Sequence, residues 1–344
     1  MREGLAYLSF TDRGQALAEK LSAALGGVTA RAGGDLSIGT WTENAFRDRS
    51  ALVFVGAAGI AVRAIAPFLR HKSEDPAVLS VDETGHYVIP LLSGHLGGAN
   101  AMALKIAAIT GGEAVITTAT DLNGVFAVDL WAAHQNMKVR QPERIKTVSS
   151  KLLAGRKILL DCRWEIRGER PENVEINSEA GKKRNNELYS TDMSKADVLV
   201  SYRSFESSSL QLIPRILTLG IGCRKGTGAE ALEEGFERFC RERRILPEAI
   251  RSAASIDCKS GEEGLIHFCR SHGWPVRFYA AEELGRAEGC FTGSDFVRSA
   301  VGVDNVCERA AVLESGGTLA EKKYAGNGIT FALAECETEF DWSW

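Results

Sequence analysis

Residues 51–60 read ALVFVGAAGI, and this stretch decides the fold class of the amino-terminal part of the chain. The apolar run up to Val55 has the length and composition of a strand that is buried on both faces. Gly56 and Gly59 then form a turn into a helix that ends near Pro67. The free N–H groups at such a helix start favour a carboxylate or a phosphate above the sheet. Tight packing of strand against helix explains the same glycines, so both interpretations stay open.

The segments on either side of this stretch alternate in the same way. Further strands are expected at residues 5–10, 77–81, 87–92 and 114–117, with a turn at 83–85, and further helices after Thr11 as N-cap and over 98–109. Alternation of strands and helices predicts a layered α/β domain with a mostly parallel sheet, which we assign to residues 1–129.

Two more domains are expected along the chain. Strand-like runs at 158–160 and 196–201 flank the polar stretch 163–194, which predicts a small middle domain over residues 130–213. A new strand, turn and helix begin near residue 216, with Thr227 and Glu230 as a capping box, so residues 214–344 are expected to form a second α/β domain. The whole chain is therefore a multi-domain α/β protein.

Composition excludes several classes of function. The 344 residues carry a net charge of −4, so no overall positive field points to a nucleic-acid partner. No apolar stretch approaches the roughly 20 residues of a membrane-spanning helix, and the first residues, MREG, do not resemble a secretory signal. The eight cysteines contain no C-x-x-C pair, which indicates free thiols in a reducing cytoplasm and no zinc site.

A glycine-dense turn follows the strand expected at 87–92. Residues 90–100 read PLLSGHLGGAN and hold Ser93, His95 and Asn100 at the start of a helix. Ligands of open α/β sheets bind outside the carboxyl ends of the strands, where we expect this turn to lie. An imidazole at that position is suited to proton transfer near neutral pH, although a single histidine is also often structural.

Another strand is expected to run into a hydroxyl-rich turn at residues 117–121, TTATD. Asp121 is either a functional acid or a cap of the following helix. Neighbouring loops bring further titratable groups that we expect to face the same cleft: Asp75, Asp82, Glu83 and His86, with Arg70 and Lys72 as countercharges.

Residues 219–228, LGIGCRKGTG, form a second glycine turn. The third glycine lies one position too late for a dinucleotide fingerprint, and the stretch is not a P-loop. What remains is a turn with two cations, Arg224 and Lys225, at a helix start, which predicts a binding site for an anion.

These motifs resemble a known family. Residues 53–63, 93–100 and 117–121 resemble the amino-terminal region of the CbiG family of cobalamin biosynthesis. Residues 220–226 and 302–308 resemble its carboxy-terminal region, which is related to the CobE protein of the aerobic pathway. The matches follow the family's order over nearly the whole chain and are weakest in the middle domain.

The resemblance implies cobalt-precorrin-5A hydrolase activity in anaerobic cobalamin (vitamin B12) biosynthesis. Such an enzyme opens the ring-A acetate lactone of a tetrapyrrole and releases acetaldehyde, which gives cobalt-precorrin-5B. The substrate carries the cobalt, so no cofactor and no protein metal site are implied. The expected partners are the tetrapyrrole and neighbouring enzymes of the pathway, with no nucleic acid and no membrane.

We expect catalysis in residues 1–129, because the CobE-type protein lacks this region. His95 is the expected base that activates water, with the Ser93 hydroxyl or the amides of Gly97 and Gly98 as oxyanion donors. Asp121 or Glu83 would take the hydroxyl proton when acetaldehyde leaves. The remaining candidates are expected to bind the substrate, mainly through its carboxylates: Gly56, Gly59, Arg63, Lys72, Gly94, Asn100, Thr118, Thr120, Gly222, Cys223, Arg224, Lys225, Asp304 and Asn305.

Two alternatives belong to other classes of function. A non-catalytic carrier of tetrapyrrole intermediates would bind the same molecule but would not need His95 or Asp121. A nucleotide-dependent oxidoreductase or transferase is opposed by the spacing of the glycines at 220–228.

Overall fold

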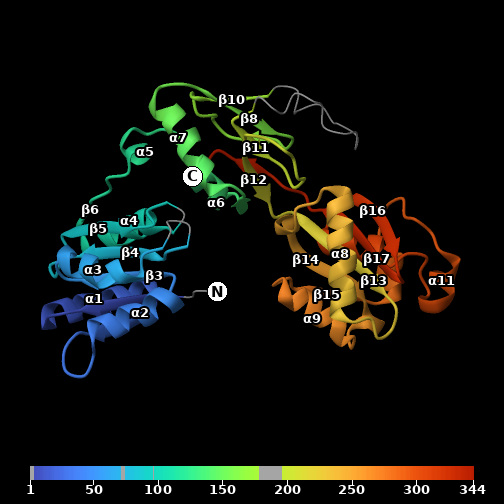
Figure 1. Ribbon diagram of the computed structural model, residues 1–344, viewed down its shortest axis with the longest axis horizontal. Coiled ribbons are helices and arrows are strands. Elements are labelled where there is room, and N and C mark those ends of the chain that lie inside the picture. The colour runs from blue at the N-terminus through green and yellow to red at the C-terminus, as the bar shows by residue number, and fades with distance from the viewer. Residues whose placement is uncertain (1–3, 71–73, 96, 178–195) are drawn as a thin grey trace. The chain divides into compact units, whose positions relative to one another are not determined.

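The computed structural model describes residues 4–70, 74–95, 97–177 and 196–344, which form two compact units, 1–130 and 131–344 (Figure 1). Lys72 and most of the polar stretch 163–194 lie outside the described residues. Each unit has mixed α/β structure, as the sequence predicts.

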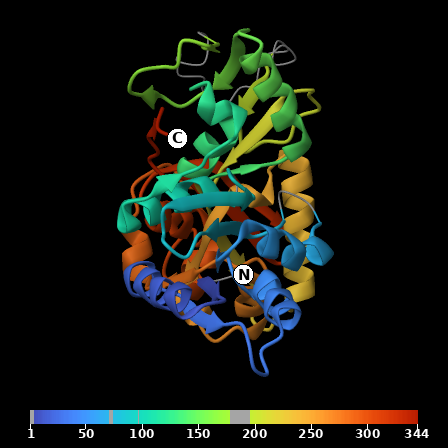
Figure 2. The same cartoon turned by 90° about the vertical axis from the view of Figure 1, so that its left-hand side faces the viewer.

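The amino-terminal unit is a six-stranded sheet with the strand order β2-β1-β3-β4-β5-β6. Its strands are β1 (Leu5–Ser9), β2 (Val28–Arg31), β3 (Ala51–Val55), β4 (Ala77–Val81), β5 (Tyr87–Leu92) and β6 (Glu113–Ala114), and its helices are α1 (Asp12–Leu25), α2 (Ile38–Asp48), α3 (Ala58–Ile65), α4 (Ala99–Thr110) and α5 (Ala119–Leu122). Helices α1 and α4 pack on one face of the sheet, and α2 and α3 pack on the other (Figure 2). Because both faces are covered, β3 and β4 are buried along their whole length, which explains their uninterrupted apolar composition.

One pair of strands breaks the parallel pattern. All neighbouring strands of this sheet run parallel except β4 and β5, which form an antiparallel hairpin. The carboxyl end of β5 therefore lies beside the start of β4, where Val78 pairs with Leu92. We call this side of the sheet, where β5 ends and β3 and β4 begin, the β5 edge. The prediction of a mostly parallel sheet is confirmed, but the carboxyl ends of its strands lie at two opposite edges.

The strand expected at residues 114–117 is much shorter than predicted. Strand β6 ends at Ala114, and the N–H of Val115 donates the last bond to the carbonyl of Val88. Because β6 lies at the end of the sheet, it has a strand on one side only, and the chain leaves it to enter α5. The segment between β6 and α5 therefore places Thr118 and Asp121 at the β5 edge, where Thr118 contacts Asn100.

The described residues of the second unit form three sheets, with the strand orders β10-β8-β11-β12-β7, β15-β14-β13-β17-β16 and β18-β9. Its strands are β7 (Met137–Val139), β8 (Ile158–Cys162), β9 (Ile166–Arg167), β10 (Val174–Ile176), β11 (Val198–Val200), β12 (Leu210–Pro214), β13 (Leu217–Cys223), β14 (Ile250–Ile256), β15 (Val276–Tyr279), β16 (Thr318–Gly326), β17 (Ile329–Glu335) and β18 (Phe340–Asp341). Its helices are α7 (Ile145–Leu153), α8 (Ala229–Arg243), α9 (Glu263–Ser271), α10 (Ala281–Gly285), α11 (Asp295–Val301) and α12 (Cys307–Ser315), while α6 (Val128–His134) includes the boundary between the units.

The glycines of the turn after β13 have packing roles. A Cβ at Gly220 would lie 1.7 Å from the carbonyl oxygen of Cys307, so α12 packs directly on the backbone of β13. A Cβ at Gly222 would lie 2.5 Å from Oγ1 of Thr330 on β17. The predicted capping box is wrong, because Gly228 is the N-cap of α8 and the Thr227 hydroxyl donates to the carbonyl of Arg224.

Candidate active site

His95 lies in the tight turn between β5 and α4. Ser93 has a φ of 57° and Gly98 a φ of 81°, and a Cβ at Gly97 would lie 2.4 Å from that of Ser93. The Gly98 N–H donates to the His95 carbonyl at 2.8 Å, and the Ser93 hydroxyl donates to the Asp75 carbonyl at 2.9 Å. The Ser93 hydroxyl and the Gly98 amide, both expected to be oxyanion donors, are therefore engaged in holding the turn.

The imidazole of His95 lies between two carboxylates. Its Nε2 is 2.8 Å from Oδ2 of Asp121, and its Nδ1 is 3.1 Å and 3.2 Å from the two oxygens of Asp129. The Thr120 hydroxyl is 3.3 Å from the same Nε2. The side chains of His95 and Asp129 are 12% and 10% exposed, while that of Asp121 is 29% exposed. We call these three residues, Asp121, His95 and Asp129, the His95 cluster.

Asn100 holds the more exposed carboxylate in place. Its Nδ2 donates to the Thr118 hydroxyl at 2.9 Å and to Oδ2 of Asp121 at 3.2 Å. A Cβ at Gly94 would lie 2.8 Å from Oδ1 of Asn100, so a glycine is needed for this approach. The structure thus brings together His95, Asn100, Thr118 and Asp121, which lie in two separate motifs of the sequence. Asn100 itself is buried, and its contacts position Asp121.

Electrostatics fix the protonation of the imidazole. Burial lowers the pKa of His95, but hydrogen bonds and charge attraction from Asp129 and Asp121 outweigh it and raise the pKa to about 9. At neutral pH the ring is therefore an imidazolium that donates from both nitrogens. A protonated ring cannot accept a proton from water, so the expectation that His95 is the first base does not fit this geometry.

This protonation makes stability depend on pH. A pKa raised from 6.5 to about 9 contributes stability that is complete below pH 6.5 and is lost as the pH rises through 9. We expect the stability advantage of the wild type over His95→Gln to shrink by about 3 kcal/mol across this interval. Urea unfolding of both proteins at a series of pH values measures this difference in the free energy of unfolding. A difference that stays constant across the interval would contradict the raised pKa.

Sequence reasoning missed Asp129. It stands in the first turn of α6, 34 positions after His95, in the apolar run VFAVDLW. Phe126, Val128 and Trp131 around it are fully buried. A lone carboxylate in such a run needs a buried partner, and this was the available signal.

The candidates at the opposite edge are not part of this cluster. A Cβ at Gly56 would lie 2.6 Å from the ring of Phe10, which favours the packing interpretation of that glycine. The Arg63 guanidinium donates to the carbonyl of Gly59 at 3.3 Å. Glu83 lies in the hairpin turn after β4 and accepts a 2.7 Å bond from the Thr11 hydroxyl. Since β5 runs antiparallel to β4, the expectation that Glu83 shares a cleft with His95 is wrong, and the same holds for Asp82 and His86.

The turn after β13 is occupied by the chain's own groups. The Gly226 N–H donates to Oε2 of Glu262 at 2.7 Å, and Nζ of Lys259 is 3.1 Å from Oε1 of the same carboxylate. Arg224 and Lys225 are exposed beside it. Burial raises the pKa of the Cys223 thiol, which does not favour a thiolate. The turn thus holds an internal carboxylate, and the prediction that it binds an anionic ligand stays a prediction.

Asp304 and Asn305 have structural contacts. Asp304 forms ion pairs with Arg309 at 2.9 Å and Arg298 at 3.3 Å. Asn305 is 1% exposed, and its Nδ2 donates to the buried carboxylate of Glu308 at 2.9 Å. A side chain buried in this way cannot reach a ligand from this conformation, so the expectation of substrate contact at Asn305 is not met.

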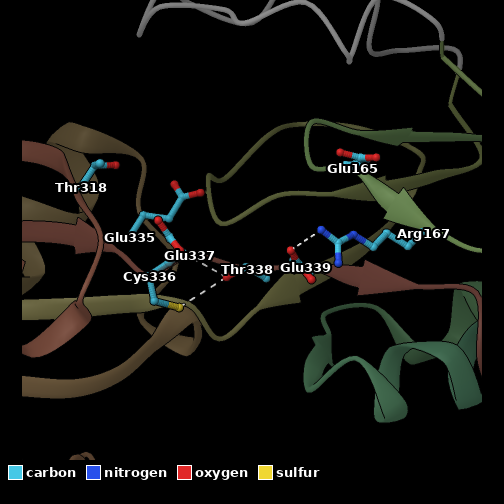
Figure 3. Close-up of a pocket in the computed structure, with 8 residues that line it drawn as sticks. All are labelled: Glu165, Arg167, Thr318, Glu335, Cys336, Glu337, Thr338 and Glu339. Carbon is cyan, nitrogen blue, oxygen red and sulfur yellow. Dashed lines mark hydrogen bonds and ion pairs between the residues drawn. The ribbon is translucent and has the colours of Figure 1, made fainter.

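A pocket of about 370 Å³ in the second unit has a different chemistry (Figure 3). Its charged lining is mostly carboxylate, and its Arg167 is paired with Glu339 at 2.5 Å. The full lining is Glu165, Arg167, Thr318, Glu335, Cys336, Glu337, Thr338 and Glu339. Such a surface repels a ligand that is rich in carboxylates.

In the part of the chain that the structure describes, no helix is both long and apolar enough to cross a membrane. Within the same residues, no three or more His, Cys, Asp or Glu side chains are grouped so that they could hold a metal ion.

Comparison with known proteins gives consistent matches along the chain. Residues 40–121 match the family model for the amino-terminal part of cobalamin synthesis protein G, 126–214 its central region and 217–334 its carboxy terminus. A cobalt-precorrin-5A hydrolase from Salmonella typhimurium is 34% identical over 96% of this chain and 97% of that protein. A protein of the same name from Priestia megaterium is 29% identical over 84% of this chain and 79% of its own length. Protein CobE from Sinorhizobium is 30% identical over 34% of this chain and 79% of that protein.

Proposed function

Because this chain belongs to the CbiG family of cobalamin-biosynthesis proteins, we propose that it is a cobalt-precorrin-5A hydrolase that opens the ring-A acetate lactone and releases acetaldehyde. The product of this reaction is cobalt-precorrin-5B, and the enzyme acts in the cytoplasm. The cobalt is carried by the substrate, and we propose no other cofactor. The observation that carries the proposal at the level of residues is the position of the His95 ring between the carboxylates of Asp121 and Asp129.

Lactone opening uses Asp121 as the base and His95 as the acid. Asp121 is the more exposed carboxylate, and its side-chain contacts with His95 and Asn100 both involve Oδ2. It takes a proton from a water molecule, whose oxygen attacks the lactone carbonyl carbon. When the bond between that carbon and the ring oxygen breaks, His95 gives its Nε2 proton to the departing oxygen. The products are a free carboxyl group and a hydroxyl on the former meso carbon.

Acetaldehyde release then reverses the direction of proton transfer. The now neutral His95 takes the proton of the new hydroxyl as the carbonyl of acetaldehyde forms and the carbon–carbon bond to the ring breaks. The macrocycle accepts the electron pair, and protonated Asp121 supplies the proton that the ring carbon takes up. Both side chains return to their starting states, so one pair of residues serves both steps.

Exposed cations in the second unit are suited to holding a carboxylate of the substrate. Arg224 and Lys225 flank the turn whose Gly226 N–H already binds the carboxylate of Glu262. A substrate carboxylate that replaces Glu262 would gain charge-assisted hydrogen bonds from the same groups. This proposal concerns only the contacts that Arg224, Lys225 and the Gly226 N–H make with a substrate carboxylate.

A carrier that only binds tetrapyrroles has no need of a buried imidazolium between two carboxylates, so the His95 cluster favours the hydrolase. We expect the purified protein to release one equivalent of acetaldehyde from each cobalt-precorrin-5A under anaerobic conditions, measured by trapping the aldehyde as its hydrazone. Tight binding of the tetrapyrrole with no aldehyde above the protein-free control would instead identify a carrier.

A further inference from the structure

We infer that Asp129 is a positioning residue, which holds the His95 ring by Nδ1 so that Nε2 faces Asp121 and the substrate. The inference rests on the proposed function, because it assigns the reacting side of the ring to Nε2. It gives the two carboxylates of the His95 cluster different tasks, and these tasks follow from their surroundings.

Asp129 is the fixed member of the pair. Its side chain is 10% exposed against 29% for Asp121, and both of its oxygens face Nδ1, at 3.1 Å and 3.2 Å. The preceding residues Phe126, Ala127 and Val128 are buried and anchor the start of α6. A carboxylate set in such a frame cannot follow a reacting group without moving the helix start.

Asp121 is the more exposed of the two carboxylates, so it can exchange its contact with His95 for one with the substrate. Its side-chain contacts with His95 and Asn100 share Oδ2, and it belongs to the short helix α5. Replacement of Asp121 by a substrate oxygen at Nε2 would leave His95 with Asp129 as its remaining carboxylate. The contact of Nδ1 with Asp129 would then hold the ring in its orientation.

Asp129 also supplies charge to the ring. Among the described residues, the charged groups that face the imidazole are Asp121 from α5 and Asp129 from α6. Buried ion pairs of this kind shift the pKa of a neighbouring group by about one to three pH units. Loss of the Asp129 charge should therefore lower the pKa of His95, whereas loss of an unrelated contact should not.

The test uses Asp129→Asn in the full-length protein. Asparagine keeps the shape and one acceptor oxygen but removes the charge. We expect the pKa of His95, measured by NMR of labelled histidine rings, to fall by about one to three pH units. We expect kcat for acetaldehyde release to fall by about 10²- to 10⁴-fold with little change in KM. Asp12→Asn is the matched control, because Asp12 also stands in the first turn of a helix but pairs with Arg31 on the surface.

A second variant separates charge from position. Asp129→Glu keeps the charge on a longer side chain, so the pKa of His95 should remain raised while kcat still falls because the ring is displaced. An unchanged pKa in Asp129→Asn, or full activity in Asp129→Glu where Asp129→Asn is impaired, would overturn the positioning role. A lowered pKa with unchanged acetaldehyde release would support the contact but overturn the proposed part of His95 in the reaction.

Discussion

Substitution of His95 by glutamine is expected to lower the rate of acetaldehyde release by about three orders of magnitude. Glutamine can donate a hydrogen bond to one of the two carboxylates, but it cannot give a proton to the departing lactone oxygen or take one from the hydroxyl. Because the imidazole serves both steps of the proposed mechanism, neither the lactone nor the hydroxy acid should be consumed at an appreciable rate. A discontinuous anaerobic assay of acetaldehyde and of residual substrate measures both quantities.

The matched control for this variant is His86→Gln. His86 lies in the hairpin turn between β4 and β5, at the opposite edge of the same sheet, and its ring contacts Tyr87. Its replacement should leave the rate within about twofold of the wild type, in line with the small effects of surface substitutions. Wild-type activity in His95→Gln, or an equal loss in both histidine variants, would remove His95 from the reaction.

Replacement of Asp121 by asparagine is expected to lower the rate of acetaldehyde release by about 10²- to 10³-fold and to stop the reaction at lactone opening. Asparagine retains an oxygen for Nε2 of His95 and a partner for Asn100, so the turn should keep its shape. It cannot take a proton from water, so the lactone should persist without accumulation of the hydroxy acid.

Mass spectrometry of quenched reactions distinguishes the stages, because the lactone and the hydroxy acid differ by one water molecule. Asp12→Asn again serves as the control, since it removes a carboxylate of the same unit that does not contact the His95 cluster. Accumulation of the hydroxy acid in Asp121→Asn would show that another group activates the water and that Asp121 acts only later.

Local sequence patterns predicted much of the amino-terminal unit. The apolar runs at 51–55, 77–81 and 87–92 are strands, and Thr11 accepts from the Gly14 N–H as the N-cap of α1. His95, Asn100 and Asp121 do meet, because turns that follow strands are polar and place side chains beyond the sheet.

The placement of Glu83 in one cleft with His95 was the main error, and the sequence contained the information to avoid it. Only residues 82–86 separate β4 from β5, whereas a parallel connection needs a crossover of a dozen or more residues. The short link forces a hairpin, and the hairpin moves Glu83 away from His95.

Other features depend on contacts between distant segments, which no local pattern reports. Asp129 meets His95 across 34 positions of sequence, and the packing roles of Gly220 and Gly222 depend on Cys307 and Thr330. Glycine turns that read as anion sites were therefore ambiguous, since close packing and ligand binding select the same residue.

The carboxylate of Glu262 already binds the Gly226 amide, so a substrate carboxylate can bind at this turn only by displacing it. If a carboxylate side chain of the tetrapyrrole binds there, it replaces Glu262. The net free energy of binding is then the difference between two similar contacts. A lone carboxylate such as acetate gains almost nothing from that exchange. A molecule already held by its other arms presents the next carboxylate at a high effective concentration and can complete the exchange. The turn would thus bind a ligand with many carboxylates in preference to small acids that carry a single carboxylate.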